Sequence, residues 1–303
     1  MAILNKGLYE SVEQIDFSDV LESFNKVRYE SHREMMMIME AAMEADVFIE
    51  RSVFEGTMEA EEADKETVKS SKSIKDKIKG VINKFIDALK KLYEKFTMWL
   101  EQLLKVNAVK KYGEDYFKDM KAFTITKQIQ LGVNFPTFNK STSDIEKKLN
   151  DYIVSMTELS LAISAGKKQD FDFVKDQKFV EEDPVEFVNA SIDKSETNKM
   201  MVIDQSFVNE MVKKVSKMDD HIKSVKKHNK EAIESLKKLQ RVFNGADDQI
   251  VNVNALKEIE ARINNILKAN SIYLNTLKEN LTGMNAVLIA VAKFEMKVKR
   301  GEK

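Results

Sequence analysis

The stretch QSFVNEMVKKVSKMDDHIKSVKKHNKEAIESLKKL, residues 205–239, decides the fold class of this chain. Its apolar positions alternate three and four residues apart, as in a heptad repeat, and lysines fill many of the positions between them. The seam positions are Val208, Met211, Val215, Met218, Ile222, Val225, Asn229, Ala232, Leu236 and Leu239. Such a long unbroken series predicts a coiled-coil helix.

A second run of the same kind follows a break at residues 244–248, Asn-Gly-Ala-Asp-Asp. Its seam positions are Leu256, Ile259, Ile263, Ile266, Asn270, Tyr273, Leu277, Met284, Leu288 and Val291. The two runs together predict an antiparallel helical hairpin over residues 201–303. Asn229 and Asn270 interrupt the two seams at nearly equal distances from the break. We therefore expect these asparagines to face each other and to fix the register of the hairpin.

Residues 73–106 carry the strongest helical pattern outside the hairpin. Ile78, Phe85, Leu89, Phe96 and Trp99 belong to one broad apolar face, and lysines occupy much of the remaining surface. Two interpretations fit this pattern. The favoured one is a core helix with a solvated, lysine-rich face; the other is a basic amphipathic helix that docks on a membrane or a partner protein.

Residues 120–200 break the helical rhythm. Apolar and polar residues alternate at 123–126, 133–138, 171–174 and 179–180, which predicts short strands or extended loops. Between them, Ser143-Asp144-Ile145-Glu146 has the pattern of a capping box and predicts a helix that runs to about Ser164.

The predicted fold is therefore mainly α, with long helices, a C-terminal antiparallel coiled-coil hairpin and a small irregular or α+β middle region. We divide the chain into three parts. Residues 1–66 form an acidic, methionine-rich helical head and linker, residues 67–200 the amphipathic helix with the mixed region, and residues 201–303 the hairpin.

The charge is unevenly distributed, although it is nearly balanced in total. The chain has 49 Lys and Arg against 50 Asp and Glu. Residues 1–60 hold 13 acidic and 5 basic residues, so an acidic head precedes a basic body. The first residues lack the pattern of a signal peptide, and the most apolar stretch, 284–292, is far shorter than the roughly 20 residues of a membrane span.

Residues that would form a catalytic, cofactor or metal site are sparse. The chain has no cysteine and only three histidines, and lysines surround His221 and His228. The nine glycines are too widely spaced for a phosphate-binding loop. We therefore expect no catalytic, cofactor or metal site, no small-molecule substrate, and a protein that is not an enzyme.

The tetrapeptide Ile38-Met39-Glu40-Ala41 resembles the cleavage signal of tailed-phage prohead proteases, which has an aliphatic residue, any residue, glutamate and a small residue. It lies in the acidic head, before the lysine-rich helical body. This arrangement resembles the internal head or core proteins of large tailed bacteriophages, mainly over residues 1–105. The resemblance implies removal of a propeptide during capsid maturation, with Ile38, Glu40 and Ala41 at the processing site.

Together these observations favour a non-enzymatic structural or interaction protein of a phage virion or head assembly, acting through helical surfaces and diffuse positive charge. The expected partners are other virion or assembly proteins, further copies of the chain and non-specific DNA. The expected location is the virion or the host cytoplasm. The alternative is an effector that binds a membrane surface or a host factor through the helix at 73–106.

Overall fold

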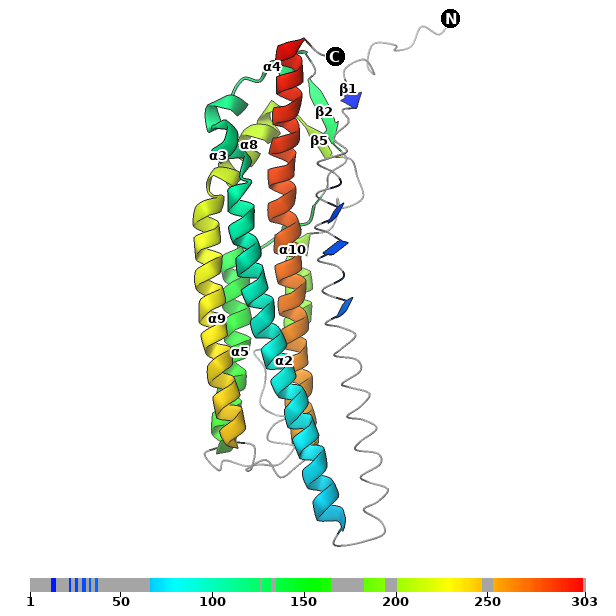
Figure 1. The fold of residues 1–303 in the computed structure, drawn as a ribbon, viewed down its shortest axis with the longest axis vertical. Coiled ribbons are helices and arrows are strands. Elements are labelled where there is room, and N and C mark those ends of the chain that lie inside the picture. Colours follow the sequence, from blue (N-terminus) through cyan, green and yellow to red (C-terminus); the bar gives the residue numbers. More distant parts are fainter. Residues whose placement is uncertain are drawn as a thin grey trace, which may run out of the picture.

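Long helices dominate the computed structural model, which describes residues 12–14, scattered positions between 22 and 37, and residues 66–125, 127–131, 135–164, 183–193, 201–246 and 253–301. Four of the described helices run along the length of the molecule (Figure 1). They are α2 (Glu66–Lys105), α5 (Thr142–Ser164), α9 (Met218–Ala246) and α10 (Val253–Arg300). The predicted mainly α fold class is confirmed.

Contacts between side chains fix the direction of α9 relative to α2. Asn83 on α2 donates a hydrogen bond to Asn244 of α9, at 3.2 Å between Nδ2 and Oδ1. Glu101, five turns further along α2, accepts one from Lys226 at 2.7 Å. Because the α9 residue numbers fall as the α2 numbers rise, the two helices are antiparallel.

The direction of α10 follows from the same kind of evidence. Tyr93 of α2 bonds to Asn270, and the residues directly after α2 bond to Asn285. The residue numbers of the two partners rise together, so α2 and α10 are parallel. It follows that α9 and α10 run in opposite directions, as predicted (Figure 1). Each arm packs closely on α2, and α9 also packs along α5. The hairpin is thus built into a bundle of four long helices.

All twenty predicted seam positions of the two heptad runs are buried. The eighteen apolar ones belong to one hydrophobic core that also contains apolar side chains of α2 and α5. The helices on both sides of residue 200 share this core. The heptad pattern therefore identified the buried stripe of each arm, and the structure shows that this stripe faces α2 and α5.

Short helices and strands occupy the connections between the long helices. The short helices are α3 (Ala108–Tyr112), a 3₁₀ turn η1 (Glu114–Phe117), α4 (Lys121–Ile125), α7 (Pro184–Ala190) and α8 (Gln205–Ser216). The strands are β1 (Val12–Gln14), β2 (Gln128–Leu131), β3 (Thr137–Phe138), β4 (Ile192–Asp193) and β5 (Met201–Ile203). β2 pairs with β1 in parallel and with β5 antiparallel, and β3 pairs antiparallel with β4.

The middle region agrees with its prediction in part. The expected helix from Ser143 to Ser164 is α5, and the strand expected within 133–138 includes β3. The extended segment expected at 123–126 is wrong, because Phe123 to Ile125 lie in α4 and the strand begins at Gln128. The stretches 171–174 and 179–180 lie outside the described residues.

Two buried polar side chains of α10 hold the connection between α2 and β2. Asn285 accepts a hydrogen bond from the Ala108 amide at 2.8 Å and donates one to the Val106 carbonyl at 2.9 Å. Glu295 accepts from the Ala122 amide at 2.9 Å and from the preceding amide at 3.2 Å. The bonds to the amides satisfy backbone groups at the start of α3 and α4, where no intrahelical partner exists.

A close approach to α10 depends on a glycine. A Cβ atom at Gly283 would lie 2.7 Å from Cβ of Phe135 and closer still to its ring. Phe135 is itself buried. The segment before β3 can therefore pack on α10 only because residue 283 has no side chain.

Candidate functional site

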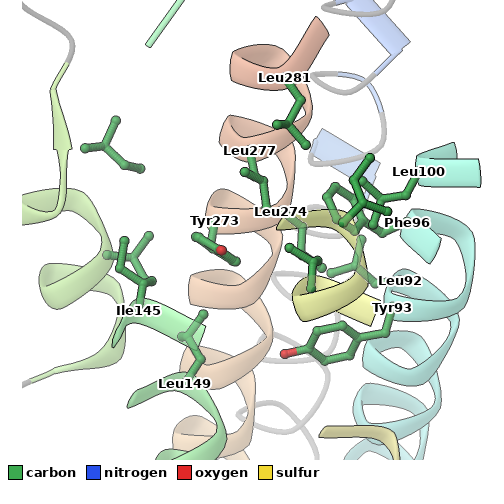
Figure 2. Packing of buried hydrophobic residues seen from close by; sticks show 14 of the residues in the cluster. Leu92, Tyr93, Phe96, Leu100, Ile145, Leu149, Tyr273, Leu274, Leu277 and Leu281 are labelled. Carbon is green, nitrogen blue, oxygen red and sulfur yellow. The ribbon is translucent and has the colours of Figure 1, made fainter. Parts of the chain in front are cut away.

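A layer of buried or half-buried polar side chains crosses all four long helices. Its members are Tyr93 and Thr97 on α2, Glu146 on α5, His228 and Asn229 on α9, and Asn270 and Tyr273 on α10. Figure 2 shows Tyr93 and Tyr273 among the leucines and Phe96 of the core. Burying polar groups is costly unless each finds a partner, so their concentration at one level makes this layer the candidate site.

Glu146 is the acidic centre of the layer. Its Oε1 accepts a hydrogen bond from the Tyr273 hydroxyl at 2.8 Å. Its Oε2 lies 3.5 Å from His228 Nε2, and the other ring nitrogen of His228 lies 3.6 Å from the Glu231 carboxylate. The Glu146 side chain is 6% exposed and that of His228 is 24% exposed. The imidazole thus links a buried carboxylate to one at the surface.

Burial determines which groups of the layer are charged. It raises the pKa of Glu146 to about 7, against the opposing effect of the Tyr273 hydrogen bond. Burial also raises the pKa of Tyr93 and Tyr273, and the nearby Glu146 charge adds to this effect. Both phenols therefore keep their protons and act as donors near neutral pH, whereas Glu146 changes its charge in that range.

The side-chain amides of both asparagines in the layer form hydrogen bonds with residues of α2. Asn229 donates to Thr97 Oγ1 at 3.0 Å, and Thr97 in turn donates to the Tyr93 carbonyl at 2.9 Å. Asn270 accepts from the Tyr93 hydroxyl and donates to the Ile266 carbonyl.

The prediction that Asn229 and Asn270 face each other is therefore wrong about the partner. Their partners, Thr97 and Tyr93, lie one turn apart on α2, so the two asparagines do lie at about the same level. The physical reason is that α2 packs against both arms and presents its own polar groups to them.

The candidate partner or membrane face of α2 is largely inside the protein. Ile78, Phe85, Leu89 and Phe96 are all buried in the core, and Trp99 is partly buried against it. This confirms the core interpretation of the helix. The other candidate residues, Ile38, Glu40 and Ala41, lie outside the described residues.

A shallow hollow of about 260 Å³ lies beside Trp99. Leu92, Phe96, Leu274 and Lys278 border it, and the Lys278 ammonium lies 5.6 Å from the centre of the Trp99 ring. Pockets for small molecules usually enclose about 300 to 1,000 Å³ and surround most of the ligand. The volume of this hollow is slightly below that range.

Sequence reasoning missed Glu146 as a buried residue. We assigned it to a capping box, where its side chain would reach back to the helix start. In the structure it points into the bundle. Its spacing carried the signal, because Glu146, Leu149, Ile153 and Met156 recur at three and four, as core positions do. His228 was likewise considered only as a metal ligand disfavoured by neighbouring lysines, although this residue directly precedes the seam position Asn229.

No known protein family, curated protein or solved structure matches this chain. Across the described residues, no group of three or more histidine, aspartate and glutamate side chains is placed to hold a metal ion. The described helices also include none with the length and apolar character needed to cross a membrane. The layer itself combines a buried carboxyl, whose pKa is raised to about 7, with tyrosine hydroxyls and asparagine amides that form hydrogen bonds between the long helices.

Proposed function

We propose that this chain is a non-enzymatic structural or interaction protein and, more specifically, an assembly component of a phage head. It would act through its helical surfaces and its positive charge. The observation that carries the proposal is the position of the processing motif: Ile38, Glu40 and Ala41 precede Glu66, where α2, the earliest of the four described long helices, begins. A cut there would leave α2 and every later element in one chain.

The sequence around the motif supports processing in this region. The triplet Met-Glu-Ala occurs at 39–41 and again at 43–45 and 58–60, all before α2. Residues 1–40 contain 8 acidic and 4 basic residues, so a cut after Glu40 would raise the net charge from -1 to +3. Processing would thus turn a nearly neutral chain into a basic one.

The polar layer supports the structural part of the proposal. Its hydroxyl, amide and carboxylate groups are bonded to neighbouring helices, as expected of groups that fix helix register. The basic amphipathic helix needed by the effector alternative has its apolar face in the core. That alternative would therefore require α2 to leave the bundle.

Mass spectrometry of the protein from its native source tests the proposal. We expect an N-terminus at Ala41 in the assembled particle and the intact chain before assembly. The segments Leu256-Lys257-Glu258 and Leu277-Lys278-Glu279 are internal controls, because they share the first three positions of the motif within α10. These segments should stay uncut. An intact N-terminus in the assembled particle would contradict the proposal.

A further inference from the structure

The outward face of α9 is the longest basic strip among the described helices. Its exposed positions Lys223, Lys227, Lys230, Glu234, Lys237 and Arg241 recur at four and three residues, with Lys238 beside them. These residues form one stripe along the helix. Figure 1 shows α9 at the outer edge of the bundle, and the exposure of these side chains means that the other long helices do not cover the stripe.

Most of this charge is not neutralised within the described part of the chain. Lys223 pairs with Asp220 at 3.1 Å, and Lys227 approaches Glu231 at 3.9 Å. Both pairs are exposed, and such pairs are weak and screened by salt. Among the described residues, the remaining basic side chains of the strip, Lys230, Lys237, Lys238 and Arg241, have no ion pair.

Neither α2 nor α5 repeats this pattern, and the exposed basic residues of α10 are confined to its last turn. On α2, exposed lysines alternate with acidic side chains such as Asp87, Glu94 and Glu101. On α5, the exposed positions include Asp144, Asp151 and Glu158. Among α2, α5 and α9, it is therefore α9 that has the largest excess of exposed basic side chains over exposed acidic ones.

We propose that the outward face of α9 binds the phosphate backbone of duplex DNA without reading its sequence. This inference rests on the proposed function, in which the protein acts through positive charge, and it names the surface and the partner. The strip from Lys223 to Arg241 is about 27 Å long at 1.5 Å per residue. It presents a cation at nearly every turn to a polyanion that carries one charge per roughly 1.7 Å of duplex.

The composition of the strip favours DNA over a membrane or an acidic protein. A helix that binds a lipid surface needs an exposed apolar face, whereas the apolar positions of α9, such as Val225 and Leu236, are in the core. A stable protein interface usually has an aromatic or apolar centre. No large exposed apolar side chain lies on the described residues of α9.

The test compares two triple variants of the full chain that change the net charge equally. One removes the strip (Lys230→Gln, Lys237→Gln and Lys238→Gln); the control removes exposed lysines of α2 (Lys84→Gln, Lys91→Gln and Lys105→Gln). Binding to a fluorescent 24-base-pair duplex is measured by anisotropy between 50 and 200 mM NaCl. Circular dichroism melting verifies that both variants fold.

Each phosphate contact contributes about -0.9 to the slope of log affinity against log salt. We expect the strip variant to bind at least about tenfold more weakly at 50 mM salt, with a slope shallower by about 2.5 to 3. The control should keep the slope of the unmodified chain. Glu234→Lys, which fills the acidic gap in the strip, should steepen the slope by about 1.

Equal losses in the two triple variants would overturn the assignment to α9. The proposal would also be overturned if anionic vesicles or a poly-glutamate peptide bound the protein more tightly than the duplex and lost this binding in the strip variant. The partner would then be a lipid surface or an acidic protein. The proposed function fails by a different result, an unprocessed N-terminus in the assembled particle. The two failures are therefore distinguishable.

Discussion

The Tyr273 hydroxyl donates a 2.8 Å hydrogen bond to Glu146 inside the helical bundle, although the pKa of this carboxyl is raised to about 7. Burial favours the neutral form of Glu146, and the hydrogen bond only partly opposes it. The groups that face Glu146 are His228 on α9, Tyr273 on α10 and, through its electrostatic effect, Tyr93 on α2. The charge state of one residue therefore couples to all four long helices.

The stability of the folded protein should fall as the pH rises from about 4.5 to about 8. The folded-state pKa of Glu146 is raised above the ordinary value of 4.5, so its contribution is fully present below pH 4.5 and is lost by about pH 8. At about 1.36 kcal/mol per pKa unit, the loss is about 3 kcal/mol. Glu146→Gln keeps an acceptor for Tyr273 but cannot ionise. We expect the variant to gain about 3 kcal/mol relative to the unmodified chain between pH 4.5 and 8.

Urea unfolding at several pH values measures this difference. Glu158→Gln is the matched control, because Glu158 is exposed on the same helix. The control should follow the unmodified chain at every pH. If Glu146→Gln also follows it, folding does not raise the pKa of the Glu146 carboxyl.

The two asparagines of the layer should differ in their effect on stability. Asn270→Leu leaves the buried Tyr93 hydroxyl without its acceptor and should cost about 1 to 3 kcal/mol. Asn229→Leu removes only a donor, because Thr97 retains its bond to the Tyr93 carbonyl, and should cost less. Because Thr97 bonds to Tyr93, the two asparagines belong to one chain of hydrogen bonds, and a double-mutant cycle should give a coupling energy of about 0.5 to 3 kcal/mol. Losses that add without coupling would mean that the two bonds to α2 are independent.

Gly283→Ala should destabilise the protein, against the usual effect of alanine in a helix. The new methyl group would occupy the position of the Phe135 side chain, and overpacking of this kind costs about 1 to 3 kcal/mol. Gly80→Ala is the control, since a Cβ atom there meets nothing within 4 Å, and it should stabilise by about 0.5 to 1 kcal/mol. Thermal melting of the two variants should give shifts of opposite sign. A stabilising Gly283→Ala would show that the Phe135 packing is not maintained.

Trp99 reports whether the apolar face of α2 stays in the bundle. This residue is the single tryptophan, and it packs 5.4 Å from Phe96 between ring centres. We expect a blue-shifted fluorescence maximum in buffer that does not move when anionic vesicles are added. A further blue shift with vesicles would favour the membrane-surface alternative.

The sequence predicted the buried faces well, because apolar residues at heptad spacing indicate which side of a helix is buried. Val208 and Val291, at the two ends of the seams, are as buried as the positions between them. Heptad spacing does not indicate which other helix packs on that side. The pairing of Asn229 and Asn270 was therefore assigned to the wrong partners, since α2 is separated from both by more than a hundred residues and its apolar face fits either arm.

Local patterns were ambiguous where tertiary contacts decide the structure. Phe123-Thr124-Ile125 alternates like a strand, but Glu295 binds the free amides at residues 121 and 122 and thereby stabilises the start of a helix. Glu146 fitted a capping box and a core stripe equally well. Charge patterns likewise could not show that the α9 lysines gather on one open face, because this depends on which side of α9 the other helices cover.

The hydrogen bonds between α10 and residues 93–122 also affect how the chain folds during its synthesis. Asn270, Asn285 and Glu295 bind groups that precede them by 173 to 179 residues. At about 5 to 20 residues per second, α2 leaves the ribosome roughly 10 to 35 s before its partners exist. During that interval its apolar face has no α10 to cover it. A nascent chain stalled before residue 253 should therefore recruit chaperones that hold exposed apolar helices, and release them once α10 has emerged.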